Sequence, residues 1–328
     1  MQATAQAQPN IALIKYWGKR DLERNIPAVD SLSITLDSLW TRTQVEFQQD
    51  LKDDQVSIDG KQDHHQAERV KNCLNFLRRK AGVNYGALVR SENNFPTGAG
   101  LASSASGFAA LVTAASKALQ LDLSDSEISD VARRASGSAA RSIFGGFVEM
   151  PCAPGDAIAK PLLDAKAWPF TVLIAVTSTA VKHTGSTVGM QLTARTSDYY
   201  RAWIETAHED FVTARKAVLT RDFEALAEIS ERSCLKMHGV MMTAQPGLIY
   251  WNGGTIEGIN RVRELRQRGV PVFFTIDAGP QLKAVCMPEH EQTVRAALTD
   301  TPGVLKVLSS ALGDGARILS NPSQETTH

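Results

Sequence analysis

The sequence predicts an α+β protein of two domains, on three observations. A chain of 328 residues is long for one hydrophobic core, and two packed domains are the usual arrangement at this length. Hydrophobic residues make up 43% of the chain and charged residues 21%, which is enough apolar material for globular cores and shows no sign of disorder. Segments typical of strands and of helices both occur, without strict alternation.

The first half of the chain contains strands followed by two helices. Alternating polar and apolar residues over 41–47, and a second short run before the turn at Asp59-Gly60, predict a β-meander. Apolar residues at spacings of three and four predict an amphipathic helix over 63–82, which ends at glycine. A second helix is expected over residues 104–121, where small and aliphatic residues follow a stretch rich in glycine and serine.

The second half of the chain contains longer helices. Buried strands are expected over residues 144–150, 170–176 and 270–276, and helices over 199–219, 222–238 and 255–268. We place the two domains at residues 1–185 and 186–328, and expect the polar tail after Asn321 to be frayed.

Charge and composition exclude several classes of function. Lys plus Arg and Asp plus Glu are both 35, so no overall basic field attracts nucleic acid or an anionic membrane. The N-terminal residues lack a basic segment followed by an apolar run, and no stretch approaches the ~20 apolar residues of a membrane span. The four cysteines lie far apart, without zinc-site spacing. We therefore expect a soluble, cytoplasmic protein with reduced cysteines.

One loop carries the signature of phosphate binding. The string PTGAGLASSASG at residues 96–107 is rich in glycine, carries hydroxyls and continues into a predicted helix. Glycines allow successive backbone N–H groups to turn toward an anion, and the helix N-terminus adds unsatisfied donors and a positive dipole end. The alternative is a glycine turn whose serines only cap the helix. The residues expected to bind phosphate are Pro96, Gly98, Gly100, Leu101, Ala102, Ser103, Ser104 and Ser106.

This loop resembles the phosphate loop of the GHMP small-molecule kinases, and further blocks narrow the resemblance. NIALIKYWGK at 10–19, DSLSITL at 30–36, SGSAAR at 136–141, GGF at 145–147, GSTVGM at 185–190 and DAGP at 277–280 are similar to blocks of the diphosphomevalonate decarboxylase family, in that family's order. Two departures are proline directly before Asn10, where we expect it one residue earlier, and Gln281 in place of the usual asparagine.

The resemblance implies both the fold and the reaction. The fold is that of the GHMP kinases, with a ribosomal S5-like N-terminal domain, a ferredoxin-like C-terminal domain and the active site in the cleft between them. The reaction is the ATP-dependent decarboxylation of mevalonate 5-diphosphate to isopentenyl diphosphate, with Mg²⁺ held by ATP phosphates and a loop serine. The enzyme is expected to be a homodimer of the mevalonate pathway.

The resemblance also implies roles for individual residues. Asp277 is the candidate base for the 3-hydroxyl, with Lys15 beside it, and Arg141 is expected to bind the C1 carboxylate while Asn10 orients its guanidinium. The residues expected to hold the diphosphate and close over the substrate are Tyr16, Lys19, Ser136, Gly137, Ser138, Ser186 and Thr187.

Other interpretations of the same residues stay open at this point. By local sequence alone, Asp277 could cap a turn before Gly-Pro. Lys15 could be a solvated lysine, and Arg141 could have the structural role of joining a loop to a helix. At the level of function, the alternatives are a mevalonate 3-kinase, a 5-phosphomevalonate decarboxylase, and a non-catalytic GHMP-like binding protein.

Overall fold

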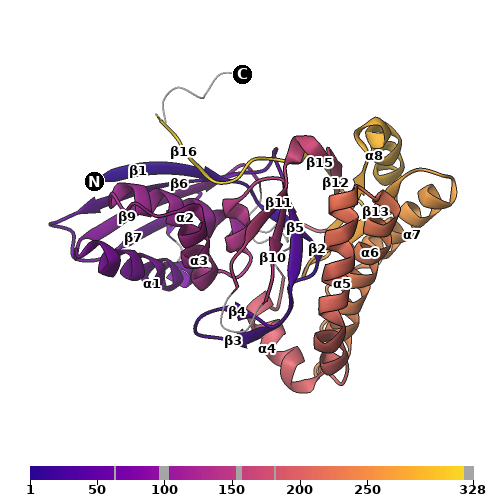
Figure 1. Cartoon of the computed structure of the whole chain (residues 1–328), viewed down its shortest axis with the longest axis horizontal. Coiled ribbons are helices and arrows are strands. Elements are labelled where there is room, and N and C mark those ends of the chain that lie inside the picture. Colours follow the sequence, from indigo (N-terminus) through magenta and orange to yellow (C-terminus); the bar gives the residue numbers. More distant parts are fainter. Residues whose placement is uncertain (63, 96–102, 153–156, 181, 321–328) are drawn as a thin grey trace.

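The computed structural model describes residues 1–62, 64–95, 103–152, 157–180 and 182–320. Within these ranges the strands form a six-stranded sheet, two four-stranded sheets and a two-stranded ribbon. The six-stranded sheet lies at one end of the elongated molecule and a group of long helices at the other, with strands β2, β5 and β10 between them (Figure 1).

The N-terminal end is a six-stranded sheet covered by three helices. The strand order is β16-β1-β6-β9-β7-β8. The strands are β1 (Gln2–Ala7), β6 (Thr41–Gln48), β7 (Gln55–Ile58), β8 (Lys61–Gln62), β9 (Gly86–Asn93) and β16 (Arg317–Ile318). The helices are α1 (His64–Ala81), α2 (Ser103–Ala118) and α3 (Asp125–Ala135). Helix α3 begins with a capping box between Ser124 and Glu127.

The middle sheet has the strand order β11-β10-β5-β2. Its strands are β2 (Asn10–Ile14), β5 (Ser31–Thr35), β10 (Phe147–Met150) and β11 (Lys160–Leu163), beside the ribbon of β3 (Lys19–Asp21) and β4 (Ile26–Pro27). Short 3-10 helices lie at η1 (Ala139–Ile143) and η2 (Ala165–Ala167). Every residue of β2 and β5 is buried, which explains why neither strand contains a charged residue.

The C-terminal end is an antiparallel sheet in the order β13-β14-β12-β15 with helices packed against it. The strands are β12 (Thr171–Val176), β13 (Val272–Ile276), β14 (Leu282–Cys286) and β15 (Lys306–Ala311). The helices are α4 (Ser186–Thr196), α5 (Tyr200–Thr220), α6 (Phe223–Met242), α7 (Gly253–Gln267), η3 (Pro288–His290) and α8 (Glu291–Thr299).

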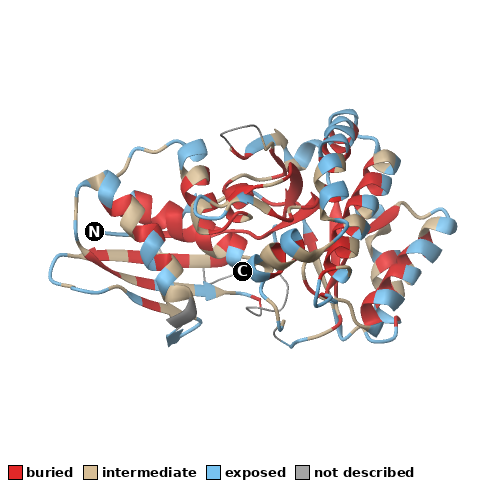
Figure 2. Ribbon diagram, turned by 90° about the horizontal axis from the view of Figure 1, so that it is seen from below, coloured by how far each residue is buried: buried red, intermediate tan, exposed pale blue. Residues whose placement is uncertain are grey.

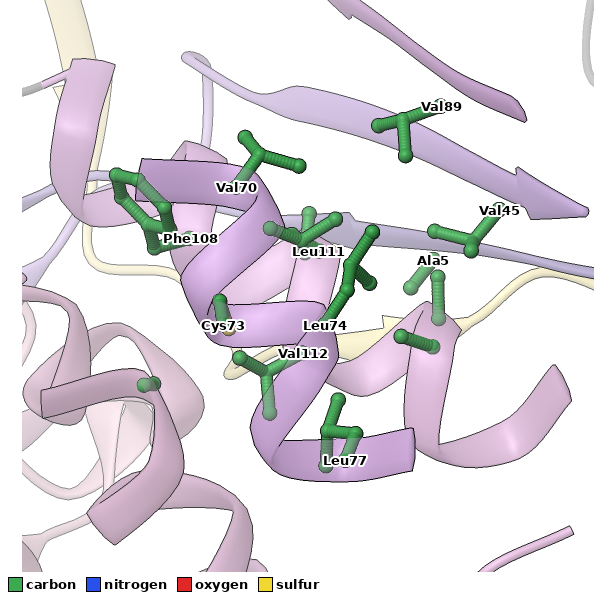
Figure 3. Close-up of a cluster of buried hydrophobic side chains, with 14 of the residues drawn as sticks. Ala5, Val45, Val70, Cys73, Leu74, Leu77, Val89, Phe108, Leu111 and Val112 are labelled. Carbon is green, nitrogen blue, oxygen red and sulfur yellow. The ribbon is translucent and has the colours of Figure 1, made fainter. Parts of the chain in front are cut away.

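Separate apolar cores stabilise the two ends, and a third core joins them. Helix α1 contributes Val70 and Leu74 to a core with α2 and the strands β6 and β9 (Figure 3). The joining core runs from Leu13 and Phe147 of the middle sheet to Phe273 and Val285 of the C-terminal sheet. Helices α5 and α6 both contain buried and exposed residues, and the helices at this end of the molecule carry buried and exposed residues side by side (Figure 2). The shared core holds the two ends of the molecule against each other.

Most predicted elements are confirmed, with end points shifted by a few residues. The predicted meander is wrong, because β6 and β7 are not neighbours. Strand β9 lies between them, antiparallel to β6 and parallel to β7. Helix α1 connects β8 to β9 and allows this non-sequential pairing, which a local pattern does not reveal.

The division of the chain at residues 185 and 186 stays a prediction. Strand β12 precedes that point and already pairs with β14 and β15 of the C-terminal sheet. The tail predicted to fray, residues 321–328, lies outside the described residues. Among the helices that the structure describes, none is long and apolar enough to cross a membrane.

Candidate active site

A cleft of about 1120 Å³ lies where the middle sheet, α2, α4 and the end of β13 meet. This volume exceeds the ~300–1,000 Å³ of an ordinary ligand pocket. Its charged lining is strongly basic, with Lys15, Lys19, Arg24, Arg69, Arg79, Arg134, Arg141 and Lys182 against Glu23 and Asp277. A chain without net charge thus concentrates positive charge at one place, which suits a large, polyanionic ligand or two anionic ligands together.

The predicted pair of Lys15 and Asp277 is in contact. Lys15 follows strand β2 and Asp277 follows β13, and the Lys15 Nζ donates to Asp277 Oδ1 at 2.7 Å. The Lys15 side chain is only 1% exposed, so it is not a solvated lysine, whereas the Asp277 side chain is 29% exposed. The candidate base, Asp277, is therefore bound by Lys15 and remains accessible from the cleft.

Asp277 is held in its ionised form. Burial by itself raises the pKa of this carboxyl, but the charges of Lys15 and Lys283, together with the hydrogen bond from Lys15, outweigh that effect and hold the pKa well below its usual range. The second lysine, Lys283 of β14, places its Nζ 3.2 Å from Asp277 Oδ2. Burial also lowers the pKa of Lys283, and the charge of Asp277 opposes this effect.

Helix α6 supports the backbone on both sides of this pair. The Ser233 hydroxyl accepts from the Lys15 N–H at 3.0 Å, and the Cys234 sulfur accepts from the Ile276 N–H at 3.2 Å. One turn further, His238 Nε2 lies 3.3 Å from the Ile276 carbonyl oxygen. Burial, aided by the charge of Lys15, lowers the pKa of His238 to about 3, so its imidazole is neutral at physiological pH.

Arg141 is fixed by three side chains of the middle sheet. On η1 it is 2% exposed, and it donates from Nε to Ser33 at 3.1 Å, from Nη1 to Ser31 at 2.8 Å and from Nη2 to Asn10 Oδ1 at 3.3 Å. Asn10 in turn donates to Ser142 at 2.8 Å. Burial lowers the pKa of Arg141 to about 10, which still leaves it charged. Three of the five N–H donors of a guanidinium are used, so two remain for a ligand in the cleft.

Tyr16 and the segment around Gly137 form one wall of the cleft. A Cβ on Gly137 would overlap the Tyr16 hydroxyl, which explains glycine at this position. The Tyr16 hydroxyl is buried and has no hydrogen-bond partner among the described residues, and burial raises its pKa. Ser136 and Ser138 lie beside it, with their hydroxyl oxygens 3.3 Å apart. Tyr16 lines the cleft, and a buried hydroxyl without a partner is costly unless a ligand pairs with it.

The opposite wall is formed by the first turn of α4 and two lysines. Lys19 Nζ donates to Thr187 Oγ1 at 3.3 Å, and Lys182 Nζ donates to Ser186 Oγ at 2.9 Å and to the Ala278 carbonyl oxygen at 3.3 Å. Burial, aided by the charge of Arg69, lowers the pKa of Lys19 to about 8. Lys182 thus connects α4 with the segment that carries Asp277.

The phosphate loop is described only in part. Ser103 and Ser104 at the start of α2 line the cleft. Ser106 is fully buried, and its hydroxyl lies 2.7 Å from that of Thr41, so the structure does not bring it into the cleft. The remaining predicted ATP-binding residues, Pro96, Gly98, Gly100, Leu101 and Ala102, lie outside the described residues.

The comparison with known proteins agrees with this geometry. Residues 7–156 match the model of the diphosphomevalonate decarboxylase-like N-terminal domain, and residues 172–317 match the mevalonate 5-diphosphate decarboxylase C-terminal domain. The chain belongs to the diphosphomevalonate decarboxylase family. Both the predicted family and the predicted α+β fold of the GHMP kinases are confirmed.

Individual members of the diphosphomevalonate decarboxylase family match along almost their whole length. The diphosphomevalonate decarboxylase of Candida albicans is 36% identical, covering 95% of this chain and 96% of that protein. The phosphomevalonate decarboxylase of Haloferax volcanii is 34% identical, and the match covers 92% of this chain and 93% of that protein. Among solved structures, the chain of MDDEF in complex with MVAPP, AMPPCP and magnesium is 36% identical. The two structures superpose with a TM-score of 0.91, over 98% of this chain and 99% of that chain.

Sequence reasoning missed several residues of this decarboxylase-family site. Lys283 and Lys182 were not predicted, nor were Ser233, Cys234 and His238 of α6. Lys283 had one signal: it is a lone cation in the otherwise apolar strand LKAVC. The departure at Gln281 is explained by the structure, because its side chain accepts from the Thr177 N–H at 2.7 Å and joins the end of β12 to the Asp277 segment.

Proposed function

We propose that this protein catalyses the ATP-dependent decarboxylation of mevalonate 5-diphosphate to isopentenyl diphosphate, CO2, ADP and phosphate. The observation that carries the proposal is the ionised Asp277, held by Lys15 and open to a basic cleft that also contains the first turn of α2. Membership of the diphosphomevalonate decarboxylase family supports it over a non-catalytic binding protein, because the candidate base and its cation are both in place.

The substrate explains why ATP is needed. It is a tertiary β-hydroxy acid and has no carbonyl group that could accept the electrons of the breaking C–CO2 bond. Phosphorylation of the 3-hydroxyl by ATP converts it into a leaving group. When this phosphate departs, C3 becomes electron-deficient, the electrons of the C1–C2 bond form the C2=C3 double bond, and C1 leaves as CO2.

We assign to Asp277 the orientation and deprotonation of the 3-hydroxyl. In phosphoryl transfer, positioning and charge neutralisation account for most of the catalysis. Because the pKa of Asp277 is held low, its carboxylate accepts the proton only after the hydroxyl oxygen has begun to bond to phosphorus and the proton has become acidic. Lys15 keeps the carboxylate ionised and balances the charge of the transferring phosphoryl group.

We assign to Arg141 the binding of the C1 carboxylate. Its two remaining N–H donors suit a bidentate contact, and Asn10, Ser31 and Ser33 fix the plane of the guanidinium. A carboxylate held in this way is oriented for the C1–C2 bond to break once the 3-phosphate departs. Binding to a cation also keeps C1 ionised, which decarboxylation requires.

The 5-diphosphate has suitable partners around the two walls of the cleft. The residues that we assign to it are Tyr16, Lys19, Ser136, Gly137, Ser138, Ser186 and Thr187, all of which line the cleft. The unpaired Tyr16 hydroxyl and the partly buried Lys19 ammonium support this assignment, because an anion would give the hydroxyl a partner and the ammonium an opposite charge.

ATP is the second substrate, and we assign its phosphates to the start of α2. The N–H groups and the dipole of this helix N-terminus suit an anion, and Ser103 and Ser104 add hydroxyls. Among the described residues no cluster of three or more His, Cys, Asp or Glu side chains could hold a metal ion. This fits Mg²⁺, which is usually bound through substrate phosphates and few protein ligands, and which would neutralise phosphate charge here.

The test of the proposed function is the stoichiometry of the products. Purified protein incubated with Mg²⁺, ATP and mevalonate 5-diphosphate should release ADP, phosphate and CO2 in equal amounts. ADP without CO2 would instead identify a 3-kinase. Turnover of the 5-monophosphate in preference to the 5-diphosphate would identify a phosphomevalonate decarboxylase, the activity by which the Haloferax volcanii relative is named.

Mevalonate itself should be a poor substrate, with a lower kcat as well as a higher KM. The diphosphate is remote from C3, and its binding energy can be used to hold the 3-hydroxyl at the γ-phosphate of ATP. The measurement is a comparison of kcat and KM for mevalonate and its 5-diphosphate at saturating ATP. Comparable turnover of the two compounds would contradict the assignment of Lys19 and the serines to the diphosphate.

We also propose that the enzyme is cytoplasmic and forms a homodimer, with domains at residues 1–185 and 186–328. The sequence resemblance supports the dimer, and large apolar side chains exposed on α5 and α6 offer area for such a contact, namely Val212, Leu219, Leu235 and Met242. The molar mass of the particle in solution tests the dimer.

A further inference from the structure

A buried lysine lies behind the candidate base, outside the lining of the cleft. Lys283 is on β14, which lies between β13 and β12, opposite Thr275 and Ile174. Its side chain is 2% exposed, and its strand neighbours Leu282 and Ala284 are fully buried. An ammonium in such surroundings loses its hydration and is costly without compensation.

The pleat of β14 directs Lys283 toward the core that joins the two ends of the molecule. Leu282, Ala284 and Cys286 belong to the core of the C-terminal end, whereas Val285 belongs to the joining core. Alternate residues of a strand face the same side, so Lys283 shares the side of Val285. This side faces the middle sheet, whose strand β2 is followed directly by Lys15.

The two lysines approach the same carboxylate at different oxygens. Lys15 Nζ is 2.7 Å from Asp277 Oδ1, and Lys283 Nζ is 3.2 Å from Oδ2. Lys15 and Asp277 line the cleft, whereas Lys283 is not part of the lining that the described residues form. A ligand in the cleft can therefore touch Asp277 and Lys15 directly, whereas Lys283 can act on the ligand through Asp277.

We infer that Lys283 is a positioning residue for the decarboxylation, which fixes the rotation of the Asp277 carboxylate and keeps it ionised while the 3-hydroxyl is phosphorylated. This inference rests on the proposed function of the site. The terminal torsion of an aspartate is broad and gives little preference by itself. With a cation on each oxygen the carboxylate plane is set, and the accepting lone pair points at one place in the cleft.

Several other titratable or charged groups also face Asp277, and they do not replace Lys283. They come from the loop before α4, from η1 and from α6, and they are Lys182, Arg141, Cys234 and His238. His238 is neutral, and burial raises the pKa of Cys234 to about 11, so neither adds charge at neutral pH. Lys182 and Arg141 line the cleft, where substrate anions can pair with them, whereas Lys283 lies outside the lining that the described residues form and pairs with Asp277.

The test compares Lys283→Met, which removes the charge, with Lys283→Arg, which keeps it. In Lys283→Met we expect kcat to fall about 10-fold or more with KM for both substrates changed less than about threefold, because the loss concerns the base and not binding. Removing one cation raises the pKa of Asp277, and activity needs its ionised form, so the acid limb of the kcat–pH profile should move about one to three units upward. In Lys283→Arg the acid limb should stay where it is in the wild type.

Lys306→Met is the matched control, since Lys306 is an exposed lysine at the start of β15 in the same sheet. It should leave kcat, KM and the pH profile unchanged. A wild-type kcat together with a wild-type acid limb in Lys283→Met would overturn the inference. So would an upward shift of equal size in Lys283→Arg, because charge would then not be the cause.

A second measurement does not depend on turnover. Urea unfolding of Lys283→Met, Asp277→Asn and the double variant forms a cycle that reports the coupling of the two side chains. We expect clear non-additivity, with the second substitution changing the midpoint less once the first is present. Additive midpoints would overturn the inference even if the wild type proves inactive, whereas an inactive wild type with a coupled cycle would count against the proposed function alone.

Discussion

Asp277→Asn should lower the rate of ADP and CO2 release on the order of 10²–10⁴-fold while ATP and mevalonate 5-diphosphate still bind. The amide keeps the size of the carboxyl group but cannot accept the proton of the 3-hydroxyl. Nor does it provide the negative charge that Lys15 and Lys283 now share. The measurement is kcat for both products together with calorimetric Kd values for the two substrates. A variant that retains a tenth of the wild-type kcat would contradict the assignment of the base.

A matched control exists in Asp210→Asn. Asp210 of α5 is another buried carboxylate with two cations, Lys236 and Arg232, and it is not part of the cleft lining of the described residues. Its loss should reduce stability and leave kcat close to wild type. In Asp277→Asn a stability loss is also expected, because a carboxylate whose pKa is lower in the folded than in the unfolded chain stabilises the fold above about pH 4. That contribution to stability disappears as the pH falls through the pKa that Asp277 has in the folded chain.

Arg141→Lys should lower kcat/KM on the order of 100-fold, although the charge is conserved. Lysine has no planar fork, so it cannot hold the C1 carboxylate by two parallel bonds while also reaching Ser31, Ser33 and Asn10. Loss of about 3 kcal/mol, roughly the contribution of one or two hydrogen bonds to charged groups, corresponds to this factor. The measurement is kcat/KM for mevalonate 5-diphosphate at saturating ATP.

Arg215→Lys is the matched control for this substitution. Arg215 of α5 donates to Glu149 at 2.8 Å in another arginine–carboxylate pair, outside the described lining of the cleft. It should leave kcat/KM within about twofold of the wild type, since partly exposed ion pairs contribute little. If Arg141→Lys also stays within about threefold, Arg141 does not bind the reacting carboxylate.

The helices of the fold were predictable because their signal is local. Val70, Cys73, Leu74 and Leu77 lie on one face at helical spacing, and α1 buries all four in the core of the N-terminal end. Strand partners were not predictable in this way. Residues 41–47 and the run before Asp59 both form strands, but β9, from later in the chain, lies between them. Strand pairing depends on contacts distant in sequence, which a local pattern does not encode.

The same distinction between local and distant information applies to the residues of the site. Lys15, Asp277, Arg141 and Asn10 were predicted from conspicuous blocks, and the structure brings them to one cleft. Ser106, predicted from the phosphate string, is buried against Thr41 instead, because a serine three residues into the first part of α2 turns toward the sheet. A sequence motif gives the residue types, but helix periodicity decides which of their side chains face the ligand.

By itself the sequence determined the two α+β halves, the main helices, the family and the candidate residues of the cleft, because hydrophobic periodicity and short motifs are local properties of the chain. Only the tertiary structure decided that Lys283 and Lys15 approach opposite oxygens of Asp277, and that Ser233, Cys234 and His238 of α6 support the backbone beside them. These residues come from separate strands and a helix. Their contacts follow from sheet register and burial, which exist only once the two ends of the molecule have packed together.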